Sequence, residues 1–162
     1  MDKGLYLKAQ SVAFTGHRTI PVPLQGEVRR RLKAAVSLAY ANGNRRFLCG
    51  MAIGFDSLAA EAVLSLKEDL PNIRLVAVVP FSGQACRWSA IERKRYHQLL
   101  SQADEVVVLS VNYYPGCLLR RNDYLLEHTH RVIAYFDGQP KGGTYYTCKK
   151  AKLCGMKVEN LF

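Results

Sequence analysis

Short apolar runs alternate along the chain with longer stretches in which apolar residues recur every three or four positions. The continuous runs are typical of strands that are buried on both faces, and the spaced pattern is typical of amphipathic helices. We predict strands over residues 11–15, 46–49, 73–79, 105–110, 131–136 and 157–161. We predict helices over residues 24–41, 56–70, 89–102, 118–129 and 143–153. This alternation favours an α/β fold, a three-layer sandwich with a mostly parallel sheet of five to six strands.

The length and composition fit one folded domain. The chain has 162 residues without an evident linker, repeat or low-complexity tract, so we predict a single domain over residues 1–162. Hydrophobic residues make up 49% of the chain and charged residues 22%, which excludes a disordered or collagen-like protein. No apolar run reaches ~18 residues and the first residues form no secretion signal, so we expect a cytoplasmic protein without a membrane partner.

The spacing of the cysteines and the net charge limit the kinds of site and ligand that are expected. The five cysteines are odd in number and form no CxxC pair, which favours reduced thiols over a disulfide framework or a zinc site. The 23 Lys and Arg residues against 13 Asp and Glu residues give a net charge of +10, which attracts nucleotides, nucleic acid or another acidic surface. The basic clusters at residues 29–33, 93–95 and 149–152 are interpreted as solvated helix faces.

Ligands of open parallel sheets bind beyond the carboxyl ends of the strands, so the residues that follow each strand are the first candidates for a site. The first predicted strand leads into Gly16, His17 and Arg18. Glycine permits a tight turn, arginine offers a fork that suits phosphate or carboxylate, and histidine can donate or accept near neutral pH. The alternative is a tight loop with a surface arginine.

The second predicted strand is followed by Gly50 and Gly54, and then by Asp56 at a helix start. Such a start favours an anion, because its backbone N–H groups are free and the helix dipole is positive there. Neither the G-x-G-x-x-G fingerprint nor the P-loop is matched. Asp56 has two open interpretations: it caps the helix, or it bonds a sugar hydroxyl or His17.

Two more strand ends carry candidate residues. After the third strand, Gln84 could read a base edge and Phe81 or Trp88 could stack on a base, although Trp88 could instead pack in the core. After the fifth strand, the pair Gly142–Gly143 and then Thr144 form a second candidate anion cradle. The alternative there is a flexible turn with Thr144 as the helix cap.

Taken in order, these segments resemble the YpsA-like family of the SLOG superfamily, which also contains the DNA-processing protein DprA and the LOG enzymes. The resemblance implies a Rossmann-like sheet with a pocket for a nucleotide or nucleotide-derived ligand, in a cytoplasmic protein of bacterial or phage type. The residues that carry it are Thr15-Gly16-His17-Arg18, Gly50-Met51-Ala52-Ile53-Gly54-Phe55-Asp56, Pro80-Phe81 with Gln84 and Trp88, Asp104, Arg121-Asn122 with Tyr124, and Asp137-Gly138 with Gly142-Gly143-Thr144.

The chain departs from the LOG enzymes at their catalytic motif. These enzymes cleave the N-glycosidic bond of a nucleoside monophosphate and carry Pro-Gly-Gly-x-Gly-Thr-x-x-Glu. Here the third glycine is missing from Gly142-Gly143-Thr144, and Thr147 stands where the acid would be. Glycoside hydrolysis normally needs a carboxylate that activates water. The departure argues against LOG-type hydrolysis unless Asp56 or Asp137 takes that role.

The leading hypothesis is a sensor-type protein that binds a small anionic nucleotide or nucleotide-sugar-type ligand. Residues 54–56 and 142–144 would hold phosphate, Arg18 would neutralise charge, and Asn122 and Gln84 would read polar groups of the ligand. One alternative is a LOG-type hydrolase or transferase with Asp56 or Asp137 as base. Another is DprA-like binding of single-stranded nucleic acid, for which the sequence shows no interleaved basic and aromatic track. No metal or further cofactor is assigned, and the oligomeric state stays open.

Overall fold

The apolar runs form a six-stranded sheet in which every pair of neighbouring strands is parallel. The computed structural model describes residues 3–162. Side chains of the inner strands are almost completely buried, which explains why their sequences are apolar at nearly every position. The strands are β1 (Ser11–Gly16), β2 (Arg46–Cys49), β3 (Arg74–Val79), β4 (Glu105–Val108), β5 (Arg131–Tyr135) and β6 (Lys157–Asn160).

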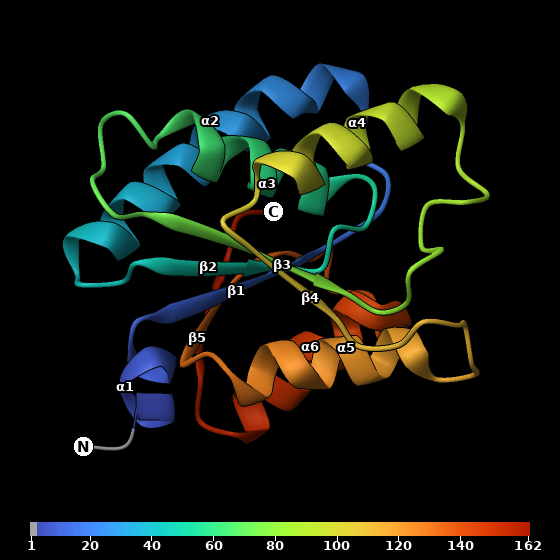
Figure 1. The fold of residues 1–162 in the computed structure, drawn as a ribbon. Coiled ribbons are helices and arrows are strands. Elements are labelled where there is room, and N and C mark those ends of the chain that lie inside the picture. Colours follow the sequence, from blue (N-terminus) through green and yellow to red (C-terminus); the bar gives the residue numbers. More distant parts are fainter. Residues whose placement is uncertain (1–2) are drawn as a thin grey trace.

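Helices cover both faces of the sheet, as Figure 1 shows. Helices α2, α3 and α4 lie on one face over a core that includes Phe14, Phe47 and Phe55. Helices α5 and α6 lie on the other face over a second core that includes Leu48 and Val132. The helices are α1 (Lys3–Ala9), α2 (Val22–Ala41), α3 (Phe55–Ser65), α4 (Ala90–Gln102), α5 (Cys117–Glu127) and α6 (Gly142–Leu153). The predicted three-layer α/β sandwich is therefore confirmed.

The strand order is β4-β3-β2-β1-β5-β6. From β1 to β4 each connection moves one strand in the same direction, and α5 then carries the chain back across the sheet to β5, beside β1. The connections that leave β1 and β5 therefore run to opposite faces. This arrangement makes the carboxyl ends of β1 and β5 the topological switch point, where an open α/β sheet places its ligand.

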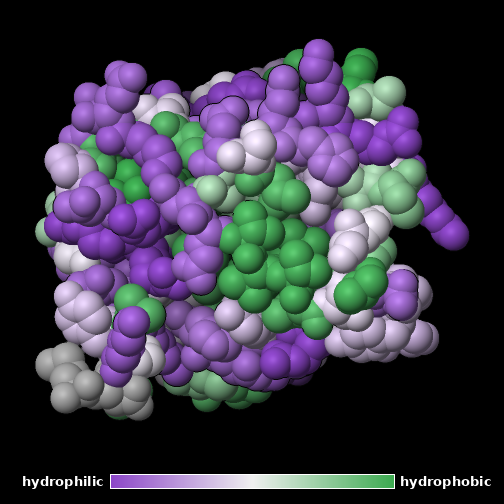
Figure 2. Space-filling view, viewed as in Figure 1, coloured by the Kyte–Doolittle hydropathy of each residue, from purple (hydrophilic) through white to green (hydrophobic). Residues whose placement is uncertain are grey.

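The two edges of the sheet differ in character. Edge strand β6 presents charged residues, including Lys157 and Glu159. Edge strand β4 instead exposes Val106 and Val108, whose side chains are 43% and 50% exposed. Figure 2 shows an apolar surface over β4 that is framed by hydrophilic residues. Beyond Glu105 at its start, which pairs with Arg46, the β4 edge thus lacks the charges with which sheet edges are usually protected.

Several element boundaries differ from the predicted ones. Helix α1 was not predicted, and it buries none of its side chains. Helix α3 begins at Phe55 with Gly54 as its N-cap, so the interpretation of Asp56 as the cap is wrong. Helix α6 begins at Gly142 after the N-cap Lys141, so Thr144 is not a cap either. Within residues 3–162, no helix is both long enough and apolar enough to cross a membrane.

Candidate functional site

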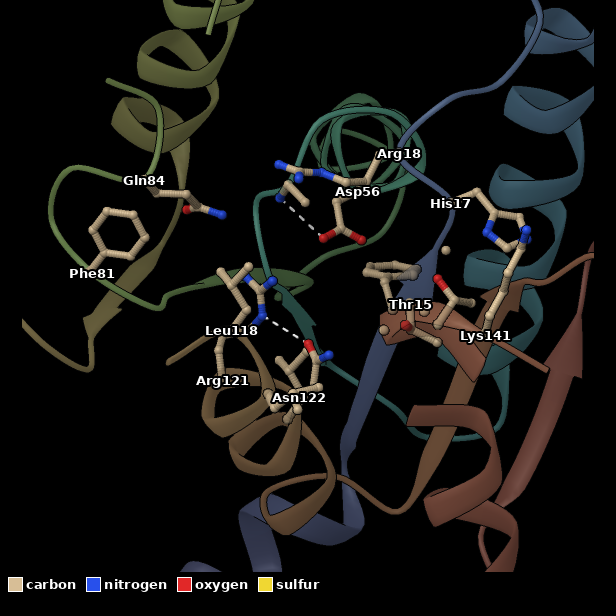
Figure 3. Close-up of a pocket in the computed structure, with 18 of the residues that line it drawn as sticks. Thr15, His17, Arg18, Asp56, Phe81, Gln84, Leu118, Arg121, Asn122 and Lys141 are labelled. Carbon is tan, nitrogen blue, oxygen red and sulfur yellow. Dashed lines mark hydrogen bonds between the residues drawn. The ribbon is translucent and has the colours of Figure 1, made fainter. Parts of the chain in front are cut away.

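A cavity of about 600 Å³ opens at the switch point, between the loop after β1 and the starts of α3, α5 and α6 (Figure 3). Its volume lies within the range of small-molecule sites. Most of the polar residues proposed from the sequence meet there, although they are far apart along the chain. The lining includes Thr15, Gly16, His17, Arg18, Asp56, Phe81, Gln84, Tyr113, Leu118, Leu119, Arg121, Asn122, Lys141, Gly142, Gly143 and Thr144.

Three helix N-termini line this cavity. Helix α3 contributes Asp56, helix α5 contributes Leu118 and Leu119, and helix α6 contributes residues 142–144. None of the three has a side-chain cap in the described chain; of the helices that start outside the lining, α4 is capped by Ser89 and α2 has no side-chain cap. Uncapped helix starts leave N–H groups for a ligand and carry positive partial charge. The cavity wall therefore favours an anion.

Arg121 forms a fixed cationic part of this wall, although it is almost completely buried. Its Nη1 donates to the carbonyl oxygen of Gly50, and its Nε donates to Oδ1 of Asn122 at 3.0 Å. A Cβ on Gly50 would lie 2.6 Å from Arg121 Nη1, so a side chain there would displace the guanidinium from its observed position. Burial lowers the pKa of Arg121, while Asp56 acts in the opposite direction. Gly50 thus positions Arg121 and is not itself part of the lining.

Asp56 and Gln84 both line the cavity, and each also carries one deeply buried oxygen. Asp56 Oδ2 accepts the N–H of Ala52 at 3.2 Å, and Gln84 Nε2 donates to the Gly50 carbonyl at 3.0 Å. The other oxygens, Asp56 Oδ1 and Gln84 Oε1, have no hydrogen-bond partner among the described residues. Burial raises the pKa of Asp56 to about 6, although Arg121 and Arg18 act to lower it. Asp56 is therefore a carboxyl group that titrates close to neutral pH.

His17 lies at the cavity wall, and the carboxylate beside it is that of Asp137 rather than that of Asp56. Its Nε2 accepts the backbone N–H of Asp137 at 2.9 Å and lies 3.2 Å from Asp137 Oδ1. The proposed hydrogen bond between His17 and Asp56 is therefore not formed. Asp137 also accepts the N–H of Gln139, and it is not among the residues that line the cavity. Asp137 thus orients the His17 ring from outside the cavity lining.

Gly54 brings the loop after β1 against the start of α3. Its φ is +83°, and a Cβ there would lie 2.3 Å from the carbonyl oxygen of Arg18. The N–H of Phe55 donates to the carbonyl oxygen of His17 at 3.0 Å. Of the predicted phosphate-binding segment 54–56, one N–H is thus used by the protein, and only Asp56 lines the cavity. Gly54 approaches backbone rather than the cavity.

Aromatic side chains lie on another part of the lining. The rings of Phe81 and Tyr113 pack edge to face with their centroids 5.4 Å apart. Trp88 does not line the cavity: it packs on the core and against Tyr96, with ring centroids 5.3 Å apart. Of the two predicted stacking candidates, only Phe81 is placed for a ligand. Tyr113 was missed because the loop after β4 carries no recognisable motif.

Lys141 was also missed, although it directly precedes the predicted glycine cradle and lines the cavity. It is exposed, as is Arg18, so both cations lie near the mouth of the cavity. In the described part of the chain, no cluster of three or more His, Cys, Asp or Glu side chains is arranged to hold a metal ion.

Comparison with known proteins places the chain among uncharacterised bacterial relatives. Residues 23–159 match the family model YpsA, described as the YspA SLOG family. UPF0398 protein BH1768 of Halalkalibacterium halodurans is 28% identical over 127 residues, which cover 77% of this chain and 67% of the relative. The SPbeta prophage-derived protein YoqJ of Bacillus subtilis is 29% identical over 74% of this chain and 78% of the relative. UPF0398 protein ABC2016 of Shouchella clausii is 30% identical over 80% of this chain and 68% of the relative.

Two solved structures share the fold. DNA processing protein A from Helicobacter pylori, whose structure concerns single-stranded DNA binding, has a TM-score of 0.65 at 17% identity, covering 99% of this chain and 68% of the other. The structural genomics target TM1055 has a TM-score of 0.59 at 15% identity, covering 92% of this chain and 72% of the other. At such identity the likeness shows the fold alone.

Proposed function

This chain belongs to the YpsA SLOG family, and from that premise we propose that it is a sensor-type protein that binds a small anionic nucleotide or nucleotide-derived ligand. The observation that carries the proposal is the meeting of three uncapped helix N-termini at one cavity. Uncapped helix starts favour an anion, because they carry free N–H groups and positive partial charge. Arg18, Lys141 and Arg121 add formal positive charge around it.

The lining suggests how such a ligand would lie. Phosphate oxygens would take the N–H groups of residues 142–144, with Lys141 and Arg18 neutralising their charge. The base would lie against Phe81 and Tyr113, since an aromatic face stacks on any nucleobase. The sugar would then occupy the space between these two regions, beside the buried polar groups.

A matched pair of charge removals tests this placement. Thermal unfolding is followed with nucleoside mono- and diphosphates and with ADP-ribose, for the wild type and for Arg18→Gln and Arg29→Gln. Both arginines are exposed, but only Arg18 lines the cavity, whereas Arg29 lies on α2. We expect a ligand-induced rise in melting temperature that Arg18→Gln removes and Arg29→Gln retains. Equal behaviour of the two variants would refute the placement, and no shift with any ligand would refute the proposal.

A LOG-type hydrolase or transferase is the second candidate, and one observation favours it. Among the described residues that line the cavity, Asp56 alone carries a carboxyl group, and its raised pKa of about 6 suits a general base or acid. The other positions do not serve: Thr147 is buried and donates to the Gly143 carbonyl within α6, and Asp137 lies outside the lining. Release of free base from nucleoside monophosphates at high protein concentration tests this reaction.

Single-stranded nucleic acid is the third candidate, and the structure of DNA processing protein A motivates it. Such binding weakens steeply with salt and strengthens with strand length. Binding of mononucleotides that equals the binding of oligonucleotides at each salt concentration would exclude it. The cavity favours the mononucleotide, because its donors converge on one enclosed volume.

A further inference from the structure

Strand β4 exposes apolar side chains on a face of the sheet that helices otherwise cover. Val107 and Leu109 pack against the core on the side of α5 and α6. Because successive side chains of a strand point to opposite faces, Val106 and Val108 lie on the side of α2, α3 and α4. Helix α4 leaves these two valines 43% and 50% exposed. Apolar side chains thus remain in water where a parallel sheet is normally covered.

The backbone of β4 is available for pairing on its outer side. Among residues 3–162, β4 has one strand neighbour, β3, with which it pairs over residues 105–108. The outer side of such an edge strand presents N–H and C=O groups that another strand can bond. The opposite edge, β6, carries Lys157 and Glu159, which discourage such pairing. The chain therefore protects one edge of its sheet with charge and leaves the other apolar.

Exposed apolar side chains are concentrated beside the β4 edge. Of the large hydrophobic side chains that are exposed in the described chain, nearly half fall within residues 106–119, and Figure 2 shows apolar surface gathered over β4. Some of them line the cavity, but Val106, Val108 and Val111 do not, so a ligand in the cavity would not cover them. A contiguous apolar patch with a hydrophilic frame is typical of a protein interface.

The charges on the α5 side of this edge cancel, although the chain as a whole carries +10. Glu105 at the start of β4 pairs with Arg46 at 3.0 Å. On α5, Arg120 pairs with Glu127 at 3.3 Å. All four groups act electrostatically on Tyr124, which places both ion pairs around one side chain. This side of the edge offers no positive excess to an acidic partner, and a second copy of the positively charged chain meets no net repulsion from it.

We propose that two copies of this chain pair through β4 and join their sheets into one continuous sheet. A two-fold axis at the edge runs the two β4 strands antiparallel, so that the donors of each copy meet the acceptors of the other. The same rotation brings the exposed valines of both copies to one face of the joined sheet and removes them from water. The outer edges of the pair are then the charged β6 strands, so assembly stops at the dimer. The inference goes beyond the proposed function and does not depend on it.

The mass of the full chain in solution tests the dimer. Sedimentation equilibrium is measured between about 1 and about 200 μM, because the population of a dimer depends on concentration. We expect the mass to rise toward twice the chain mass of 18.2 kDa and no further. Val106→Lys and Val108→Lys should each raise the dissociation constant at least ten-fold, since a lysine would enter the apolar contact. Leu38→Lys on α2, where the side chain is 56% exposed, is the matched control and should leave the constant unchanged.

Hydrogen exchange of the wild type tests the strand pairing itself and needs no variant to fold. Peptides that cover residues 103–110 should exchange more slowly at high than at low protein concentration, because new hydrogen bonds form along β4. Peptides that cover the other edge, residues 156–161, should exchange at the same rate at both concentrations. A chain that stays monomeric at all concentrations overturns the inference. Equal dimerisation of Val108→Lys and Leu38→Lys overturns the location, and a dimer without slower exchange in β4 overturns the pairing.

Discussion

Titration of Asp56 makes the stability of the fold depend on pH in a direction opposite to that of most carboxylates. Burial raises the pKa of this group from its ordinary value of 3.8 to about 6 in the folded protein, against the opposing effects of Arg121, the Ala52 N–H and Arg18. The folded state therefore binds the proton more tightly than the unfolded chain does. Consequently, the free energy of unfolding falls as pH rises through the interval between these two pKa values, and the loss is complete above it.

The size of the effect follows from the shift. About two pKa units correspond to ~3 kcal/mol, because one unit is worth about 1.4 kcal/mol. Part of the interval lies at acid pH, so between about pH 4.5 and about pH 7 the expected loss is ~2 kcal/mol. Asp56→Asn keeps the shape of the side chain and removes its titration. As pH rises over this range, the wild type should therefore lose ~2 kcal/mol of unfolding free energy relative to the variant.

Urea unfolding at a series of pH values measures this difference, with fluorescence of the single tryptophan, Trp88, as the probe. Subtraction of the two curves cancels the other titrating groups. Asp123→Asn provides a control of opposite sign: burial alone would raise the pKa of Asp123, but hydrogen bonds from Lys150 and Tyr146 lower it below its ordinary value. In that control the wild type should gain stability relative to the variant as pH rises through the acid range. A wild-type minus Asp56→Asn difference that stays constant with pH would refute the reasoning.

Three further outcomes are expected. Gly54→Ala should lower the free energy of unfolding by about 3 kcal/mol, because φ is +83° and the new Cβ would meet the Arg18 carbonyl. Gly26→Ala should raise the free energy of unfolding by ~0.5–1 kcal/mol, because Gly26 lies inside α2 with open space around it. Denaturant titration measures both changes. Gly143→Ala should leave the melting temperature unchanged but weaken nucleotide binding by about ten-fold in calorimetry, because the methyl group would enter the cavity without a close contact. In the native state iodoacetamide should modify only the exposed thiols, giving two adducts by intact mass and five in denaturant; these thiols are Cys86 and Cys154.

Periodicity predicted the sheet and five of the helices because these elements bury one or both faces, and burial forces a regular apolar pattern. Helix α1 escaped prediction for the same reason, since it buries no side chain. The order of the strands could not be predicted, because it depends on where in the sheet each helical connection returns the chain. The site was anticipated where a strand leads into a glycine and a basic residue, as at residues 16–18, and where glycines open a helix, as at residues 142–144.

The burial of Arg121 could not be predicted, because an arginine within an amphipathic helix usually faces solvent. It is buried because Gly50 leaves room for it and Asn122 accepts one of its hydrogen bonds. In the sequence, Gly50 and Gly54 precede a helix start that favours an anion. In the structure, the groups that approach these two glycines closely belong to the protein itself: the Arg121 guanidinium and the Arg18 carbonyl. A glycine in the sequence indicates that another group comes close to the backbone, and only the tertiary structure identifies that group.

The net charge of +10 and the cavity act on an anion at different distances. The overall field attracts every anion alike, and salt screens it beyond about 8–10 Å. Within contact distance, a ligand instead meets the groups that line the cavity: the uncapped helix starts, Arg18 and Lys141. The excess of basic residues therefore brings anions to the protein, while the cavity distinguishes among them by its shape and by the positions of its donors.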